Sequence, residues 1–398
     1  MSRGSSMGTG AGAPGMSSMA QGFTSQDEVW MRRALALAAR GQGRVEPNPM
    51  VGCVLVRNGR VVGEGYHRRF GGPHAEVNAL SAAGVQARGA TVYVTLEPCC
   101  HFGKTPPCTD ALVAAGSRKV IAAMRDPFPA VGGRGLRRLR SAGIEVVSGL
   151  CQADARRLNG PYLKRLRTGQ PWVILKWAQS LDGKIATRTG DSRWISSRRS
   201  TVYAHRLRGR VDALIVGVGT VVADDPLLTC RHVRPRRIAT RIVLDPTLRT
   251  PLRARLVRTA GRIPTIIVTG RQAARGPRRR RYERAGVNIL GVRSTRAGLD
   301  LKALLEELGR RGMTNVMVEG GGRTLGAFYD AGLADELVVF VARRIIGGRL
   351  APSPLSGEGP RRLREIRPPV AVRRLRSGPD DLYHVLLSDP TAAQTGGA

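Results

Sequence analysis

Three side chains able to bind a transition metal lie next to predicted helix starts or a predicted strand end in the first half of the chain. His74 follows a Gly-Gly-Pro turn, Cys99 follows the end of an apolar segment, and Cys108 follows a Pro-Pro pair. A catalytic zinc ion takes three protein ligands and leaves a fourth position for water. Helix starts also favour the thiolate form of cysteine that binds the metal. These residues therefore predict a zinc site at His74, Cys99 and Cys108.

Glu76 lies two residues after His74, close enough to reach the fourth position without serving as a ligand. A metal lowers the pKa of a bound water, and a neighbouring carboxylate can move the proton that is released. Glu76 is therefore the predicted proton shuttle of a hydrolytic deaminase. Two alternatives stay open: His74 caps a helix, or Cys100 or His101 completes a closed structural zinc site.

Two glycine clusters in the second half each follow a predicted strand. They are Gly217-Val218-Gly219 and Gly320-Gly321-Gly322. Backbone amides at a glycine turn that leads into a helix can bind an anion. Neither cluster completes the Gly-x-Gly-x-x-Gly pattern of a standard dinucleotide site, so each is equally compatible with a bare turn.

The chain carries a formal net charge of +36, with 65 basic residues. Only six of these are Lys, and this bias weakens the inference of a nucleic-acid partner that such a charge invites. Arg278–Arg281, the densest run, is interpreted as a solvated loop or helix end. The guanidinium groups of Arg208 and Arg231 can each donate paired hydrogen bonds to the oxygens of a phosphate. A position on a solvent-exposed surface explains either residue equally well.

The elements that position the first group of residues predict a sheet covered by helices. Asn58-Gly59 predicts a tight hairpin turn. The predicted strands of this half are 50–56, 91–96, 119–124 and 144–147, and the predicted helices are 74–83, 109–115 and 135–142.

A second alternation of strands and helices begins after Gly169-Gln170-Pro171. Its predicted strands are 172–176, 213–216, 241–245, 265–269, 315–318, 337–341 and 383–388. The length of the chain also favours two domains. We predict a disordered tail at 1–24, a metal-binding domain at 25–150, a connecting helix and linker at 151–170, a second α/β domain at 171–390 and a short tail at 391–398.

No apolar run is long enough to cross a bilayer, and the first residues lack the features of a secretory signal. The expected location is the cytoplasm, with no membrane partner.

Several segments resemble the bifunctional deaminase–reductase family of riboflavin biosynthesis. In the first half these are Asn48–Cys53, Gly63–His67, Pro73–Glu76 and the run EPCCHFGKTPPC from Glu97 to Cys108. In the second half they are Leu175–Lys184, Ser192–Ile195, Gly219–Pro226 and Val318–Gly321. The resemblance spans nearly all of 26–388. Cys100 departs from the family, which has a small polar residue there, and Pro246 takes a place that is often Ser.

The resemblance implies a cytidine-deaminase-like three-layer domain followed by a dihydrofolate-reductase-like α/β domain. It implies zinc at His74, Cys99 and Cys108, with Glu76 catalytic, and deamination of a phosphoribosylated diaminopyrimidinone. Asn48 resembles an amide that related deaminases place against the base, although a turn Asn before Pro49 explains it as well. The expected partner is a small phosphorylated pyrimidine, and no nucleic-acid partner is expected. The expected assembly is a dimer or a tetramer.

For the second half the resemblance implies NADPH-dependent reduction of the ribosyl group to a ribityl chain. The implied NADPH contacts are Ala178, Trp194, Thr220, Asp224, Gly321, Gly322, Arg323, Thr324, Leu325, Gly326 and Ala327. The implied substrate contacts are Ser192, Arg208, Leu228, Arg231 and Glu319. Lys176 and Asp182 are candidate proton donors. Two rival functions remain: a nucleic-acid base deaminase, and a regulator in which zinc is only structural.

Overall fold

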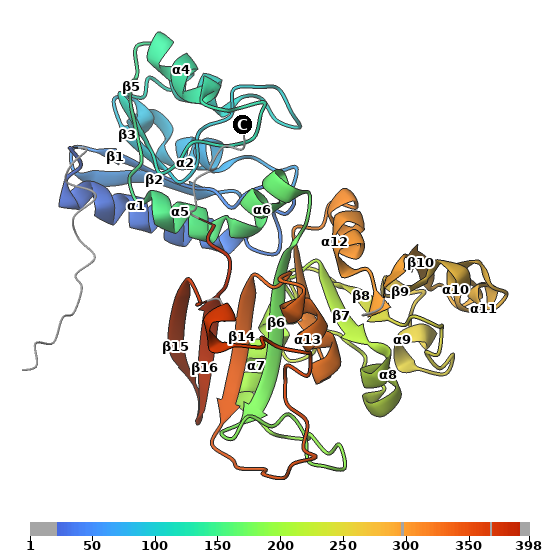
Figure 1. Cartoon of the computed structure of the whole chain (residues 1–398). Coiled ribbons are helices and arrows are strands. Elements are labelled where there is room, and N and C mark those ends of the chain that lie inside the picture. The colour runs from blue at the N-terminus through green and yellow to red at the C-terminus, as the bar shows by residue number, and fades with distance from the viewer. Residues whose placement is uncertain (1–21, 296–297, 367, 391–398) are drawn as a thin grey trace, which may run out of the picture. The chain divides into compact units, whose positions relative to one another are not determined.

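The computed structural model describes residues 22–295, 298–366 and 368–390, which form two compact units (Figure 1). The first contains 22–39, 51–66 and 74–155, and the second contains 40–50, 67–73 and 156–390. The second unit thus begins ahead of the predicted boundary at 171. The predicted tails, 1–24 and 391–398, lie outside the described residues except for 22–24.

The first unit is built on a five-stranded sheet in the order β2-β1-β3-β4-β5. β1 is antiparallel to both β2 and β3, whereas β3, β4 and β5 run parallel. The strands are β1 (Gly52–Arg57), β2 (Arg60–Tyr66), β3 (Thr91–Val94), β4 (Lys119–Ala122) and β5 (Glu145–Ser148). Asn58 and Gly59 both have positive φ and form the β1–β2 turn, as predicted.

Helices cover both faces of this sheet. One face packs against α1 (Ser25–Ala38), which begins with a capping box between Thr24 and Asp27. The other face packs against α2 (Ala75–Ala83), α3 (Cys108–Ala114) and α4 (Arg134–Ser141) through one apolar cluster. The three layers agree with the predicted fold class.

Two glycines in β2 let α2 lie directly on the sheet. A Cβ at Gly63 would collide with the carbonyl oxygen of Ala79, and one at Gly65 would collide with that of Ala75. Any side chain at these positions would push α2 outward. The glycines therefore fix the start of α2, where His74 and Glu76 lie.

The second unit is built on a nine-stranded sheet in the order β10-β9-β8-β7-β13-β6-β14-β16-β15. The strands from β10 to β14 in this order are parallel, and β16 and β15 add an antiparallel edge. The strands are β6 (Trp172–Ser180), β7 (Ala213–Gly217), β8 (Thr240–Leu244), β9 (Thr265–Gly270), β10 (Asn288–Val292), β13 (Asn315–Glu319), β14 (Glu336–Ala342), β15 (Ala371–Ser377) and β16 (Asp380–Leu386).

Both faces of the parallel strands are buried, as is usual for parallel sheets. α7 (Arg198–Arg208) and α8 (Val218–Asp224) contribute to the apolar cluster on one face. α12 (Leu301–Arg310) and α13 (Gly322–Asp330) contribute to the cluster on the other. The remaining described helices include α5 (Gln152–Leu158), α6 (Gly160–Thr168), α9 (Arg255–Arg258), α10 (Arg271–Arg275) and α11 (Arg279–Arg284).

The connecting helix and one edge strand differ from the sequence predictions. The predicted connecting helix is two helices, α5 and α6, which meet at Asn159, and Pro161 lies in the first turn of α6. The exposed Arg278–Arg281 run lies at the start of α11, which agrees with its interpretation as a solvated helix end. β15 was not predicted because it is an edge strand with mostly exposed side chains, so it lacks an alternating apolar pattern.

A buried ion pair ties α6 to the sheet of the second unit. Lys164 on α6 pairs with the carboxylate of Asp335, and both side chains are buried. The same carboxylate accepts hydrogen bonds from the backbone N–H of Val173 (2.7 Å) and the hydroxyl of Ser388 (2.8 Å). α6 is therefore attached to the second unit rather than being a free connector.

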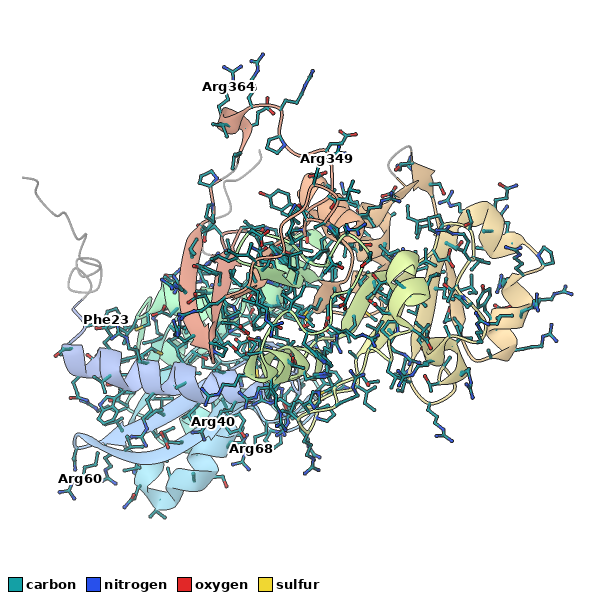
Figure 2. All side chains as sticks on the ribbon, turned by 90° about the horizontal axis from the view of Figure 1, so that it is seen from below. Phe23, Arg40, Arg60, Arg68, Arg349 and Arg364 are labelled. Carbon is teal, nitrogen blue, oxygen red and sulfur yellow. The ribbon has the colours of Figure 1, made fainter. Side chains whose placement is uncertain are left out.

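The exposed arginines are spread over separate elements. Figure 2 shows Arg60 extending outward from β2, and Arg349 and Arg364 extending outward from the segment between β14 and β15. Within the described ranges, no helix is long and apolar enough to span a membrane.

Arg241 on β8 is fully buried without a carboxylate partner among the described residues. Its guanidinium donates instead to the hydroxyls of Thr259 (2.7 Å) and Thr265 (2.6 and 3.0 Å). It also donates to the carbonyl oxygens of Leu227, Leu256 and Ile263. Burial lowers its pKa to about 10.

We predict that Arg241→Met lowers the free energy of unfolding by about 3 kcal/mol or more, because it leaves several buried acceptors unpaired. Arg280→Met, at an exposed position on α11, is the matched control and should change stability little. Denaturant unfolding of both variants measures the difference. Equal stability of the two would contradict a structural role for Arg241.

Candidate metal centre and ligand cavity

His74, Cys99 and Cys108 converge in the first unit. One ligand atom of each lies within 4.8 Å of the others, and this is the one such group among the residues that the structure describes. His74 Nδ1 is 3.2 Å from Cys108 Sγ and 3.5 Å from Cys99 Sγ. His74 immediately precedes α2, and Cys108 is the first residue of α3. The structure thus brings together the three predicted ligands.

The chemistry of this group fits zinc. An imidazole and two thiols at these separations match the donor set of a three-ligand zinc site. Hydrogen bonds from Cys108 and His74 lower the pKa of the Cys99 thiol, and the bond to Cys99 raises the pKa of His74. The cluster therefore stabilises negative charge on the Cys99 sulfur, whereas the same contact raises the pKa of the Cys108 thiol. His74 makes no side-chain capping bond to α2, so the capping alternative is not observed.

Neither candidate for a fourth protein ligand belongs to the group. Cys100 Sγ lies 4.0 Å from the carbonyl oxygen of Ala130. The His101 ring lies 6.1 Å from that of Phe128. Within the described part of the chain, the donor set stops at three protein ligands.

Glu76 lies in the first turn of α2 and is 3% exposed. Burial, together with the nearby Cys99 thiolate, raises the pKa of Glu76 to about 7. A carboxyl group poised in this range can both accept and release a proton. Glu76 is not one of the three grouped donors.

Sequence reasoning missed Glu97, which is 3% exposed. Its carboxylate accepts hydrogen bonds from the backbone N–H groups of Asp126 (3.1 Å), Gly133 (2.9 Å) and Leu136 (3.2 Å). Glu97 therefore anchors the loop before α4 to the segment that carries Cys99. The only sequence signal was its place before Pro98-Cys99.

Asn48 lies in residues 40–50, which belong to the second unit. Its side-chain nitrogen is 3.2 Å from His67 Nε2, and His67 Nδ1 is 3.1 Å from the carbonyl oxygen of Pro73. Asn48 is thus held by side-chain contacts as well as by its position before Pro49. Its predicted contact with a base stays a prediction.

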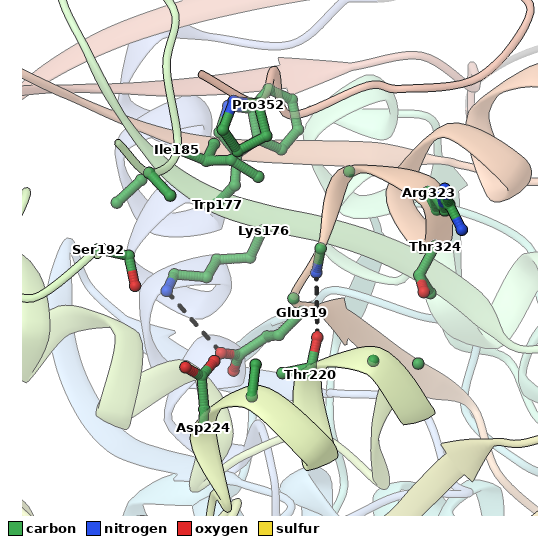
Figure 3. Close-up of a pocket in the computed structure, with 18 of the residues that line it drawn as sticks. Lys176, Trp177, Ile185, Ser192, Thr220, Asp224, Glu319, Arg323, Thr324 and Pro352 are labelled. Carbon is green, nitrogen blue, oxygen red and sulfur yellow. Dashed lines mark hydrogen bonds and ion pairs between the residues drawn. The ribbon is translucent and has the colours of Figure 1, made fainter. Parts of the chain in front are cut away.

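The second unit contains a cavity of about 770 Å³ at the carboxyl ends of β6, β7, β8 and β13 (Figure 3). This volume is within the range of small-molecule and cofactor sites. Most of the predicted cofactor residues line it: Ala178, Trp194, Thr220, Asp224, Gly321, Gly322, Arg323, Thr324 and Ala327. The predicted substrate residues that line it are Ser192, Arg208, Arg231 and Glu319.

Three predicted residues do not line the cavity. Leu325 is fully buried in the apolar core beneath α13, and Gly326 packs against the backbone of Gly357. Leu228 is 3% exposed and belongs to the core on the opposite face of the sheet. The predicted ligand contacts of Leu325, Gly326 and Leu228 therefore stay predictions that the cavity lining does not include.

The two glycine turns lie side by side because β13 pairs with β7. The backbone N–H of Gly321 donates to Thr220 Oγ1 over 3.2 Å, the contact drawn in Figure 3. Gly320 has a φ of 119°, and a Cβ there would lie 2.7 Å from Thr220 Oγ1. The cavity floor therefore depends on glycine at this position. A dinucleotide cofactor fits such a floor, since backbone amides approach its phosphates closely.

A buried charge cluster forms one wall. Arg208 donates two hydrogen bonds to Glu319, of 2.8 and 2.7 Å, and Lys176 Nζ lies 3.9 Å from the same carboxylate (Figure 3). Burial alone would raise the pKa of Glu319, but Arg208 and Lys176 hold it at about 2. Burial also lowers the pKa of Lys176, whose ammonium lies 5.7 Å from the centroid of the Phe340 ring.

Asp182, the other candidate proton donor, does not line the cavity. Its carboxylate accepts hydrogen bonds from the backbone N–H groups of Ile346 (3.0 Å) and Gly347 (2.7 Å). A hydrogen bond from Ser180 and these two amides lower the pKa of Asp182 to about 2. Asp182 therefore holds a turn.

Comparisons with known proteins cover both units. Residues 24–124 match the family described as the cytidine and deoxycytidylate deaminase zinc-binding region, and residues 171–376 match the RibD C-terminal domain. The riboflavin biosynthesis protein RibD of Aquifex aeolicus is 44% identical over 87% of this chain and 94% of its own length. RibD of Escherichia coli is 44% identical over 81% and 89%.

Two solved structures are similar across nearly the whole chain. Acinetobacter baumannii RibD has a TM-score of 0.80 and 36% identity, covering 91% of this chain and 99% of its own. A Thermotoga maritima diaminohydroxyphosphoribosylaminopyrimidine deaminase/5-amino-6-(5-phosphoribosylamino)uracil reductase has a TM-score of 0.78 and 34% identity, with the same coverage. These similarities confirm the predicted fold class.

The three-donor group predicts how zinc content responds to substitution. Cys108→Ser should lose most of the bound zinc, because a serine hydroxyl does not ionise as a thiol does. Cys100→Ser, next to a predicted ligand but outside the group, is the matched control and should retain about one zinc per chain. Metal analysis of the purified proteins measures both. If Cys100→Ser lost zinc and Cys108→Ser kept it, the assignment of Cys108 as the ligand would be wrong.

Proposed function

The chain belongs to the RibD family of riboflavin biosynthesis, and on that premise we propose which of its residues carry each of the two activities. It is a bifunctional enzyme, a zinc-dependent pyrimidine deaminase joined to an NADPH-dependent reductase. We take the substrates to be those in the name of the Thermotoga maritima relative. The deaminase removes an amino group from the diaminopyrimidine, and the reductase converts the ribosyl group to ribityl.

The observation that carries this proposal is that one chain holds both a three-donor metal group and a cofactor-sized cavity. The purified protein should release ammonia from the diaminopyrimidine and then oxidise NADPH with the product. Following ammonia and NADPH absorbance together tests both steps in one sample.

In the deaminase, His74, Cys99 and Cys108 hold zinc. When bound, zinc lowers the pKa of a coordinated water towards neutrality. Glu76 is buried beside the ligands but is not one of them, so its carboxylate takes up a proton and delivers it to the departing amine. Asn48 is proposed to contact the base, on the resemblance alone.

In the reductase, the lining residues from Gly321 to Thr324, with Ala327, Ala178, Trp194, Thr220 and Asp224, bind NADPH. NADPH supplies the hydride. Arg208, Arg231, Ser192 and Glu319, which line the same cavity, hold the substrate. Lys176 is the remaining candidate proton donor, since it lines the cavity and its pKa is lowered by burial.

The two rival functions have no support. No nucleic-acid partner is indicated, and the RibD matches extend over the second unit, where a base deaminase would need a nucleic-acid surface instead. A purely structural zinc would need a fourth ligand, which the described donor group lacks. We also propose a homo-oligomer, dimer or tetramer, and a cytoplasmic location; sedimentation and cell fractionation test these.

We predict that Glu76→Gln lowers the rate of ammonia release by at least about 100-fold, because the amide cannot transfer the proton. Zinc content should stay at the wild-type level, as should NADPH oxidation with preformed deaminated substrate, which serves as the internal control. Ammonia release at the wild-type rate by this variant would contradict the assignment of Glu76 as the proton shuttle.

We predict that Thr220→Val weakens NADPH binding about fivefold to tenfold, because the near-isosteric side chain no longer accepts the hydrogen bond from Gly321 that orders the glycine turn. Titration of NADPH fluorescence gives the dissociation constant. Ammonia release by the same variant should be unchanged. A variant that binds NADPH as tightly as the wild type would show that this bond does not support the site.

A further inference from the structure

His205 is a cavity residue to which neither sequence reasoning nor the roles above give a function. It lies on α7, lines the cavity together with Arg208 and Arg231, and is 3% exposed. Its backbone carbonyl accepts a hydrogen bond from the Cys230 thiol over 3.1 Å, which fixes the loop that carries Arg231. The imidazole is thus held at one place on the wall.

A hydrogen bond determines which ring nitrogen carries the proton. The backbone N–H of Arg231 donates to His205 Nδ1 over 3.1 Å, so Nδ1 must present its lone pair. A neutral imidazole then carries its hydrogen on Nε2. Burial, together with the positive charges of Arg208 and Arg231, lowers the pKa of His205 to about 4, so the ring is neutral near pH 7.

The Nε2–H group is a donor without a protein partner. Among the described residues, no hydrogen bond from His205 Nε2 is found, although the side chain is more than nine-tenths buried. The nearby His232 ring packs at right angles to it, with centroids 4.5 Å apart. A donor on a cavity wall that has no protein acceptor is suited to an acceptor on a ligand.

The neighbouring charges indicate what that acceptor is. Arg208 and Arg231 add two guanidinium groups to the same wall, but Arg208 is already bonded twice to Glu319. A phosphate has three terminal oxygens and accepts more bonds than Arg231 alone provides. The neutral Nε2–H of His205 adds one more donor for the phosphate. It also leaves the two hydrogen bonds between Arg208 and Glu319 in place.

We propose that His205 Nε2–H, with Arg208 and Arg231, binds the phosphate of the reductase substrate. The proposal rests on the proposed function, because it assigns a subsite for the phosphoribosyl group. It makes His205 a residue that selects phosphorylated over dephosphorylated substrate. NADPH binding does not depend on it.

Two substitutions separate the nitrogens. Asparagine places its amide oxygen near the position of Nδ1, and so keeps the bond from Arg231 but not the cavity donor. Glutamine places its amide N–H₂ near the position of Nε2, and so keeps the donor. We expect His205→Asn to raise the KM for phosphorylated substrate and the dissociation constant of ribose 5-phosphate about tenfold. His205→Gln should restore both to within about threefold of wild type, with kcat and NADPH affinity little changed in either.

The measurements use the full-length protein, with steady-state kinetics and calorimetric titration of ribose 5-phosphate. The proposal requires weaker phosphate binding in His205→Asn and near-wild-type binding in His205→Gln, and any other pattern overturns it. Weaker binding in His205→Gln alone would show that only the hydrogen bond from Arg231 matters. If the wild type does not oxidise NADPH with the substrate, the reductase assignment fails. The ribose 5-phosphate titration still decides the role of His205 in that case.

Discussion

In both sites, a stretch of backbone lies so close to a helix start or to a neighbouring turn that no side chain fits between them. In the first unit, Gly63 and Gly65 let α2 lie directly on β2, which sets the position of His74 and Glu76. In the second unit, Gly320 lets the turn before α13 meet Thr220 on α8. The chemistry of each site is thus held by contacts that only glycine permits.

The parts of the site that sequence predicts well are those whose chemistry is local. The ligands His74, Cys99 and Cys108 were identified because each adjoins a helix start or a strand end, and the fold then brings them together. Glu97 and His205 were missed because their roles depend on backbone amides of residues distant in sequence. No local pattern marks such partners.

The prediction of the strands shows the same division between features with a local sequence pattern and features without one. Strands buried on both faces, such as β7 and β13, coincide closely with their apolar runs, since burial dictates their composition. The edge strand β15 has no such requirement and was missed. Leu228 packs in the core and is not among the lining residues, so its predicted contact with substrate stays a prediction. Family position alone does not show whether such a residue contributes a side chain or a backbone group.

The ion pair between Lys164 and Asp335 bears on where the two activities can be separated. A reductase fragment starting at Pro171 would lack Lys164 and leave the Asp335 carboxylate buried without its cation, a defect that costs about 3 to 5 kcal/mol in comparable pairs. Cutting the chain ahead of α6 would preserve the pair. The place to divide the chain therefore lies between α5 and α6, before the helix that sequence alone assigns to a linker.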